Sequence, residues 1–160
     1  MTYCESFAPV WRKDAKILIL GSMPGVESLR QQQYYAFKHN VFWRIMGELF
    51  HFDATLPYSE RLKCLLKNHV ALWDTLGQCE RHGSLDTAIQ HAIPNDIPGL
   101  LKKCPKITRI LCNGTAAATH FRRNFPQYIP MMTQLPSTSP AAARLTYAQK
   151  RNAWKQAICP

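Results

Sequence analysis

The strongest constraint on the fold is a series of short apolar runs that each stop abruptly at a turn. The runs Lys16–Leu20, Val70–Trp73 and Ile107–Cys112 end at a glycine, an aspartate and an asparagine, respectively. Short apolar runs bounded by turn residues are typical of buried strands. A fourth run of this kind, Tyr128–Met132, leads into a segment rich in proline and hydroxyl groups.

Patterns typical of helices lie between these runs. Over Asn40–Phe50 the apolar residues recur at helical spacing, and Asn40 stands where an N-cap is expected. The other helices that we predict cover residues 22–33, 58–67, 96–104, 115–124 and 146–158. Strands that alternate with helices predict a parallel sheet covered on both faces, which is an α/β fold.

Length and composition indicate the broad class. The 160 residues suit one domain with its own core, so we predict a single domain over 1–160. No apolar run approaches the length of a membrane span, and the first residues carry no secretion signal. We therefore expect no membrane partner and a cytoplasmic location, associated with the nucleoid if the source is bacterial. The six cysteines lack the spacing of a metal site, so we expect reduced thiols, no metal and no cofactor.

Charge is distributed unevenly along the chain. Residues 1–96 hold ten Lys or Arg and ten Asp or Glu, whereas residues 97–160 hold ten Lys or Arg and no acidic residue. The net charge of +10 therefore comes from the second part alone. A large region without carboxylates favours binding to a polyanion, most simply the phosphates of a nucleic acid. The alternative is a generally basic surface without a dedicated partner.

Polar residues gather at one edge of the predicted sheet. Ligands of such sheets bind at the carboxyl ends of the strands. That edge collects Gly21–Gly25, Asp74-Thr75, Asn113-Gly114 and Leu135–Pro140. Asp74 is the best-placed acid there, either as catalytic support or as a turn residue. No serine-hydrolase elbow, no zinc-protease motif and no pair of carboxylates accompanies these loops.

Each loop at this edge allows a structural and a functional interpretation. The glycines around Ser22-Met23-Pro24 would let the backbone approach a ligand, although a tight turn explains them equally well. Tyr34-Tyr35 are either core aromatics or a platform on which a base stacks. The amide of Asn40 suits a helix cap as well as a base edge. Ser137-Thr138-Ser139, between two prolines, suits phosphate oxygens or serves as a simple connection.

The motifs GSMPG, YYAFKHNVFWR, CNG and LPSTSPA follow one another in a recognisable order. In this combination the sequence resembles the uracil-DNA glycosylase superfamily, and most closely the branch described as hypoxanthine-DNA glycosylases. The resemblance implies a three-layer α/β/α sandwich around a four-stranded parallel sheet. It also implies a monomeric DNA glycosylase of base excision repair, which flips a deaminated base out of DNA and excises it.

The resemblance also assigns roles to single residues. Close relatives carry an Asn or Asp in the first loop where this chain has Met23, so the catalytic role moves to Asn40. Asn113 would read an edge of the base, and Tyr35 or Phe42 would stack on it. The residues expected to contact the base are Gly21, Ser22, Met23, Pro24, Gly25, Tyr35, Phe42 and Asn113.

The loop that matches LPSTSPA would grip the DNA backbone. The DNA-binding residues expected on this basis are Ser137, Thr138, Ser139, Pro140, Arg144 and Lys150. Some relatives insert a leucine from this loop into the gap that the flipped base leaves, whereas this chain has three alanines at 141–143.

Two other functions remain open at this stage. One is a glycosylase of the same fold whose main substrate is uracil or a mismatched base. The other is a catalytically silent nucleic-acid-binding module.

Overall fold

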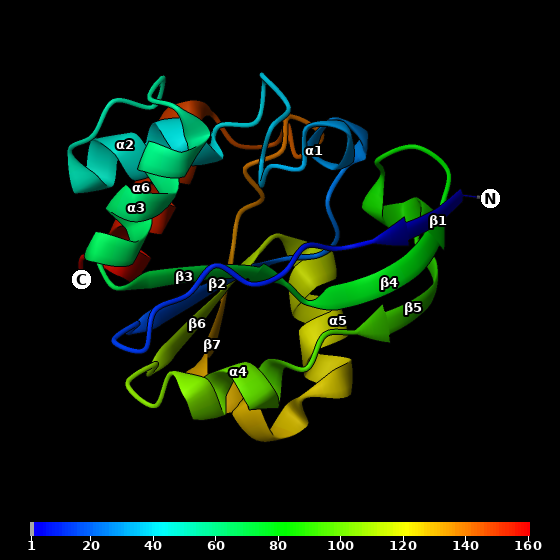
Figure 1. Ribbon diagram of the computed structural model, residues 1–160. Helices are drawn as coiled ribbons and strands as arrows, with labels where there is room; N and C mark the ends of the chain where they lie inside the picture. Colours follow the sequence, from blue (N-terminus) through cyan, green and yellow to red (C-terminus); the bar gives the residue numbers. More distant parts are fainter. Residues whose placement is uncertain (1) are drawn as a thin grey trace.

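A four-stranded parallel sheet forms the centre of the molecule (Figure 1). The computed structural model describes residues 2–160. The strands are β2 (Ile17–Gly21), β3 (Val70–Asp74), β6 (Arg109–Asn113) and β7 (Met132–Leu135), in the order β3-β2-β6-β7. Each neighbouring pair is parallel, so all four carboxyl ends meet at one edge.

Helices cover both faces of this sheet, which confirms the predicted three-layer fold. On one face, above the sheet in Figure 1, lie α2 (Phe42–Phe50), α3 (Tyr58–Lys67) and α6 (Tyr147–Ile158). On the other face lie α4 (Ile97–Lys103) and α5 (Thr115–Asn124). A short helix, α1 (Val26–Gln31), follows β2 and leads to a turn before α2.

The alternation of side chains along the strands explains the two layers. In β2, Leu18 and Leu20 belong to the core under α4 and α5, whereas Ile17 and Ile19 belong to the core under α2, α3 and α6. Successive residues of a strand point to opposite faces, so a strand that is apolar throughout can be buried on both. All five residues of β2 are buried.

A second sheet was not predicted from the sequence. It is antiparallel, in the order β1-β4-β5, and is formed by β1 (Thr2–Glu5), β4 (Leu76–Arg81) and β5 (Gln90–Pro94). Strand β4 begins one residue after β3 ends, so the second sheet extends from the carboxyl edge of the first. A one-turn 3-10 helix, η1 (Asp86–Ala88), lies in the connection between β4 and β5.

Two predicted elements differ from the structure. The helix expected over 22–33 is limited to α1, because the chain is still extended at Gly25 and adopts a positive φ of 55° at Gln32. The strand expected over 128–132 is a 3-10 segment, η2 (Pro126–Met131), with β7 beginning at Met132. Pro130, inside the predicted strand, has no backbone N–H to donate to a neighbouring strand.

The N-cap of α2 is Val41 rather than Asn40.

None of the helices within residues 2–160 combines the length and apolar character that crossing a membrane requires. The six cysteines are all unpaired thiols.

Candidate active site

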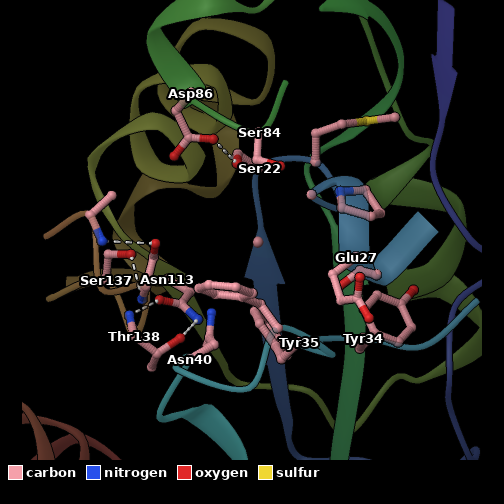
Figure 2. A pocket seen from close by; sticks show the side chains of 18 of the residues that line it. Ser22, Glu27, Tyr34, Tyr35, Asn40, Ser84, Asp86, Asn113, Ser137 and Thr138 are labelled. Carbon is pink, nitrogen blue, oxygen red and sulfur yellow. Dashed lines mark hydrogen bonds between the residues drawn. The ribbon is translucent and has the colours of Figure 1, made fainter. Parts of the chain in front are cut away.

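A cavity of about 460 Å³ opens at the carboxyl edge of the parallel sheet (Figure 2). Its size lies within the usual range of small-molecule sites. The predicted loops meet there: the 21–25 loop, Asp74 at the end of β3, Asn113 at the end of β6, and the loop after β7. Asn40 and Asn113 lie beside each other on one wall, and Ser22 and Asp86 lie on the opposite wall (Figure 2).

Gly21 allows three segments to approach closely at the bottom of the cavity. A Cβ atom added at Gly21 would lie 2.5 Å from Oδ1 of Asp74 and 3.1 Å from Oη of Tyr35. Only a residue without a side chain permits this approach. The backbone is tied here as well, since the N–H of Thr75 donates to the carbonyl of Gly21 at 2.7 Å.

Asp74 is a buried carboxyl group with an unpartnered oxygen. It is 3% exposed, and its Oδ2 has no hydrogen-bond partner within residues 2–160. Burial raises the pKa of Asp74 to about 7; nearby Arg81 opposes this shift and Asp86 adds to it. The same burial, together with the nearby Asp74 carboxylate, raises the pKa of Tyr35 above its ordinary value. Near neutral pH Asp74 can therefore hold or release a proton.

The wall opposite the two asparagines is built by the connection between β4 and β5. Ser22 Oγ donates to Oδ1 of Asp86 at 2.6 Å, and the N–H of Val26 donates to Ser84 Oγ at 2.8 Å. The buried Arg81 guanidinium donates to the carbonyls of Pro24 and Ser84 and so joins this connection to the 21–25 loop. Sequence reasoning missed Ser84, Leu85 and Asp86 as lining residues, because they belong to no strand end of the parallel sheet.

Met23 lies in the 21–25 loop, at the position where the family resemblance led us to expect a polar residue. Its side chain is 6% exposed and packs with Cys4, Leu76 and Cys79 in a small core beneath the antiparallel sheet. The apolar residue is therefore suited to its surroundings, although it still lines part of the cavity.

Tyr35 forms an aromatic wall of the cavity, supported from behind by Phe42. The two rings are stacked with centroids 4.0 Å apart, and Tyr35 adopts a positive φ of 56°. Phe42 is fully buried and does not line the cavity. The prediction that Phe42 contacts a base is thus wrong; its position beneath Tyr35 makes it a support for that ring.

The Asn40 amide is held in one orientation. The N–H of Phe42 donates to its Oδ1 at 3.0 Å, so this oxygen caps the start of α2 from the residue before the N-cap. Its Nδ2 has no partner within residues 2–160. Asn40 is half-buried and lines the cavity, so both hydrogens of Nδ2 remain for a ligand.

Asn113 binds the loop after β7 through both atoms of its amide. Its Nδ2 donates to Oγ1 of Thr138 at 3.0 Å, and the N–H of Thr138 donates to its Oδ1 at 2.9 Å. Both residues are buried. Thr138 does not use the second amide hydrogen of Asn113, so the role of Asn113 in reading a base edge stays a prediction.

The 136–141 loop is also held by α6. Lys150 Nζ donates to the carbonyl of Ser139 at 3.1 Å, and Trp154 Nε1 donates to the carbonyl of Pro136 at 3.0 Å. Lys150 is buried and lies outside the cavity lining, so the prediction of a direct DNA contact is replaced by a bracing role. Arg144 is exposed and also lies outside the lining, which leaves its predicted contact with DNA untested. Ser137, Thr138, Ser139 and Pro140 all line the cavity.

Within residues 2–160, no group of three or more His, Cys, Asp or Glu side chains is arranged to hold a metal ion. The cavity lining combines amides, hydroxyls, the carboxyl groups of Glu27, Asp74 and Asp86, and an aromatic face.

Comparison with known proteins identifies the family. The family model of the uracil DNA glycosylase superfamily matches residues 9–159. The chain belongs to the uracil DNA glycosylase superfamily. A hypoxanthine DNA glycosylase from Methanosarcina barkeri is 31% identical over 161 residues, which cover 96% of this chain and 97% of that protein. A hypoxanthine DNA glycosylase from Methanosarcina acetivorans is 38% identical over 117 residues, which cover 72% of this chain and 74% of that protein.

A solved structure shares the fold of this superfamily member. The solution NMR structure of a candidate uracil DNA glycosylase from Methanosarcina acetivorans superposes with a TM-score of 0.84 at 33% identity. The match covers 98% of this chain and 97% of that chain. The family and the fold predicted from the sequence are confirmed.

Because the pKa of Asp74 is raised, we predict that Asp74→Asn increases the free energy of unfolding more at pH 8 than at pH 5. Above the unfolded pKa near 4, the folded state binds more protons at Asp74 than the unfolded state does, so wild-type stability falls as the pH rises to about 7. Asparagine removes this loss. In urea unfolding, the gain in unfolding free energy should be about 2 kcal/mol greater at pH 8 than at pH 5.

Asp53→Asn is the matched control for this measurement. Asp53 is exposed, and hydrogen bonds from Thr55 lower its pKa, so its carboxylate is ionised at both pH values. Its substitution should change stability by the same amount at pH 5 and pH 8. An Asp74→Asn effect that is equally independent of pH would contradict the assignment of a raised pKa to Asp74.

The pair formed by Asn113 and Thr138 predicts a difference between two substitutions of nearly the same size. Thr138→Val removes the acceptor of Asn113 Nδ2 and leaves a buried donor unpaired, so unfolding should become easier by about 1–3 kcal/mol. Thr138→Ser keeps the hydroxyl and should retain most of the stability lost in the valine variant. Equal urea midpoints for the two variants would show that the hydroxyl does not hold the loop.

Proposed function

We propose that this protein is a DNA glycosylase of base excision repair. It flips a deaminated base out of DNA and hydrolyses the N-glycosidic bond of that base, and its preferred substrate is hypoxanthine. The observation that carries the proposal is the amide of Asn40, whose oxygen is held by the N–H of Phe42 and whose unpartnered Nδ2 leaves two donor hydrogens for a ligand in the cavity. The family and the names of both Methanosarcina relatives support it.

The fixed amide supplies a physical basis for choosing a deaminated base. Deamination replaces an exocyclic amino group by a carbonyl group, and hypoxanthine differs from adenine in this way. A carbonyl oxygen accepts from Nδ2 of Asn40, whereas an amino group would set donor against donor. Turning the amide over would sacrifice the bond from Phe42, so a mismatched group should lose about 1–3 kcal/mol.

The reaction is a hydrolysis. The bond between C1′ of the sugar and N9 of the base breaks, a water oxygen joins C1′, and the departing base gains a proton. The sugar passes through a cation-like transition state, which the negative phosphates of the substrate stabilise. The protein supplies the energy to unstack the base and donors for the negative charge that develops on it. Asn40 is the donor we assign to that role.

Tyr35 and Asp74 complete the proposed base pocket. The face of Tyr35, supported by Phe42, provides a flat apolar surface against which a purine can stack. In its neutral form Asp74 can donate one hydrogen bond to a ring nitrogen, and in its ionised form it can accept from an N–H.

The 136–141 loop is proposed to bind the DNA backbone beside the flipped nucleotide. Backbone N–H groups and hydroxyls are common partners of phosphates, and Ser137, Ser139 and Pro140 lie at the cavity. We also expect the enzyme to act as a monomer. A chromosomal substrate leads us to expect it in the cytoplasm, at the nucleoid if the source is bacterial.

The proposal is tested with duplex oligonucleotides that each contain one inosine, uracil, xanthosine or mismatched thymine. Under single-turnover conditions, followed by alkali to break abasic sites, we expect the fastest cleavage at inosine and none at adenosine. Faster cleavage at uracil would identify a uracil glycosylase of the same fold. No product from any strand would indicate a nucleic-acid-binding module without glycosylase activity.

Asn40 variants test its role directly. Asn40→Ala removes the donor and should slow inosine excision by about 100-fold or more while changing DNA affinity little. Asn40→Asp keeps the shape and the acceptor for Phe42 but cannot donate when ionised, so it should lose nearly as much activity. Asn152→Ala, at an exposed position on α6, is the control and should behave as wild type. Excision at the wild-type rate by Asn40→Ala would rule out the assignment.

A further inference from the structure

Three large apolar side chains are exposed where they border the cavity. Val26 is 54% exposed, Phe37 is 46% exposed and Leu85 is 60% exposed, and all three are lining residues. Apolar side chains exposed beside a binding site suggest contact with a partner. When a flipped base occupies the cavity, the side chain nearest the DNA would contact the neighbouring bases.

Charge separates the three positions. Val26 precedes Glu27, and Leu85 precedes Asp86; both of these acids line the cavity and would repel phosphates. Phe37 is instead followed by the exposed Lys38 and His39. Of the three, Phe37 alone is followed directly by a cationic side chain, Lys38, which a DNA strand favours.

Phe37 is linked to the loop that is proposed to bind the DNA backbone. It begins a turn in which the N–H of Asn40 donates to its carbonyl at 2.9 Å. The next residue, Val41, donates its N–H to the carbonyl of Thr138 at 3.1 Å. The position of Phe37 is therefore fixed relative to both Asn40 and the 136–141 loop.

The ring of Phe37 is supported from its own turn. His39 packs edge-to-face against it, with ring centroids 5.4 Å apart. An aromatic ring at such a place can stack on an unpaired base or fill the space between two base pairs. The loop after β7 has alanines at 141–143, which are too small to occupy the space of a base, and its one large apolar side chain, Leu145, lies outside the cavity lining.

We propose that Phe37 is the side chain that enters the base stack and fills the gap left by the flipped nucleotide. The proposal rests on the proposed function, since it requires a base to leave the duplex. It makes Phe37 a positioning residue: it acts on the neighbouring bases of the duplex and holds the flipped state open for Asn40. The turn over residues 37–40 couples insertion of the ring to placement of the Asn40 amide.

The test compares inosine in duplex and in single-stranded DNA. A single strand has no base stack to fill, so Phe37→Ala should slow excision from duplex about tenfold or more and leave single-strand excision within about twofold. Phe37→Trp keeps a large ring and should restore duplex excision. Ile93→Ala, which shortens an exposed apolar side chain on β5 outside the cavity lining, is the matched control and should alter neither rate.

A binding measurement separates failure of this proposal from failure of the proposed function. Wild type should bind a duplex with a tetrahydrofuran abasic site more tightly than the undamaged duplex, and Phe37→Ala should lose most of that preference. If wild type excises inosine but Phe37→Ala retains both the duplex rate and the abasic-site preference, Phe37 is not the inserted residue. Equal losses on duplex and single strands would also overturn it, because the ring would then act on the flipped base itself. If wild type excises no base at all, the proposed function has failed; the abasic-site preference then decides the Phe37 proposal separately.

Discussion

The pair of hydrogen bonds between Asn113 and Thr138 is the constraint on which the rest of the cavity depends. Asn113 ends β6 and Thr138 follows β7, so the pair binds the last loop to the end of the neighbouring strand. The carbonyl of Thr138 then accepts from the N–H of Val41, next to Asn40. Three segments far apart in the sequence are thus joined through one buried threonine. Because these bonds lie within the protein, the wall that carries Asn40 is formed before any DNA binds.

The opposite wall is built by a different principle. Arg81, Ser84 and Asp86 come from β4 and the connection that follows it. They hold the 21–26 segment through the carbonyl of Pro24, the hydroxyl of Ser22 and the N–H of Val26. The two walls also differ in charge, with Asp86 on this side and Lys38 near the other. We expect this difference to guide a polyanion toward the asparagine wall, while a neutral base enters the space between the walls.

Asp74 shows that the site reduces stability. A buried carboxyl group with an unpartnered oxygen is unfavourable when it is ionised. The absence of a side chain at Gly21 nevertheless leaves the space in which the Asp74 carboxyl group and the Tyr35 hydroxyl group lie. Such a group at the bottom of a cavity is typical of a residue kept for its chemistry.

The sequence predicted β2, β3, β6 and the carboxyl edge of the parallel sheet well, because these strands are short apolar runs closed by distinctive turns. Strand β7 was placed too early, because its sequence, Met-Thr-Gln-Leu, is only partly apolar. The strand ends located four of the segments that form the cavity, including Asn113, whereas Asn40 was singled out through the family resemblance. It could not predict the antiparallel sheet, since β1, β4 and β5 are short, are partly exposed and lack a continuous apolar run. Phe42 and Lys150 were assigned ligand contacts, whereas the structure buries both, because residue type does not reveal whether a side chain faces the cavity or supports it.

The most direct test is the side-chain amide signal of Asn40 in NMR spectra of ¹⁵N-labelled protein. Signals are recorded with duplexes that contain a non-hydrolysable 2′-fluoro analogue of either deoxyinosine or deoxyadenosine, and the Asn40→Asp variant identifies the resonance by its loss. We predict that the Nδ2 hydrogens of Asn40 shift strongly with the inosine analogue and little with the adenosine analogue, because only the former offers a carbonyl acceptor. Equal shifts with both duplexes, or no shift with either, would contradict the claim that the fixed amide of Asn40 selects the deaminated base.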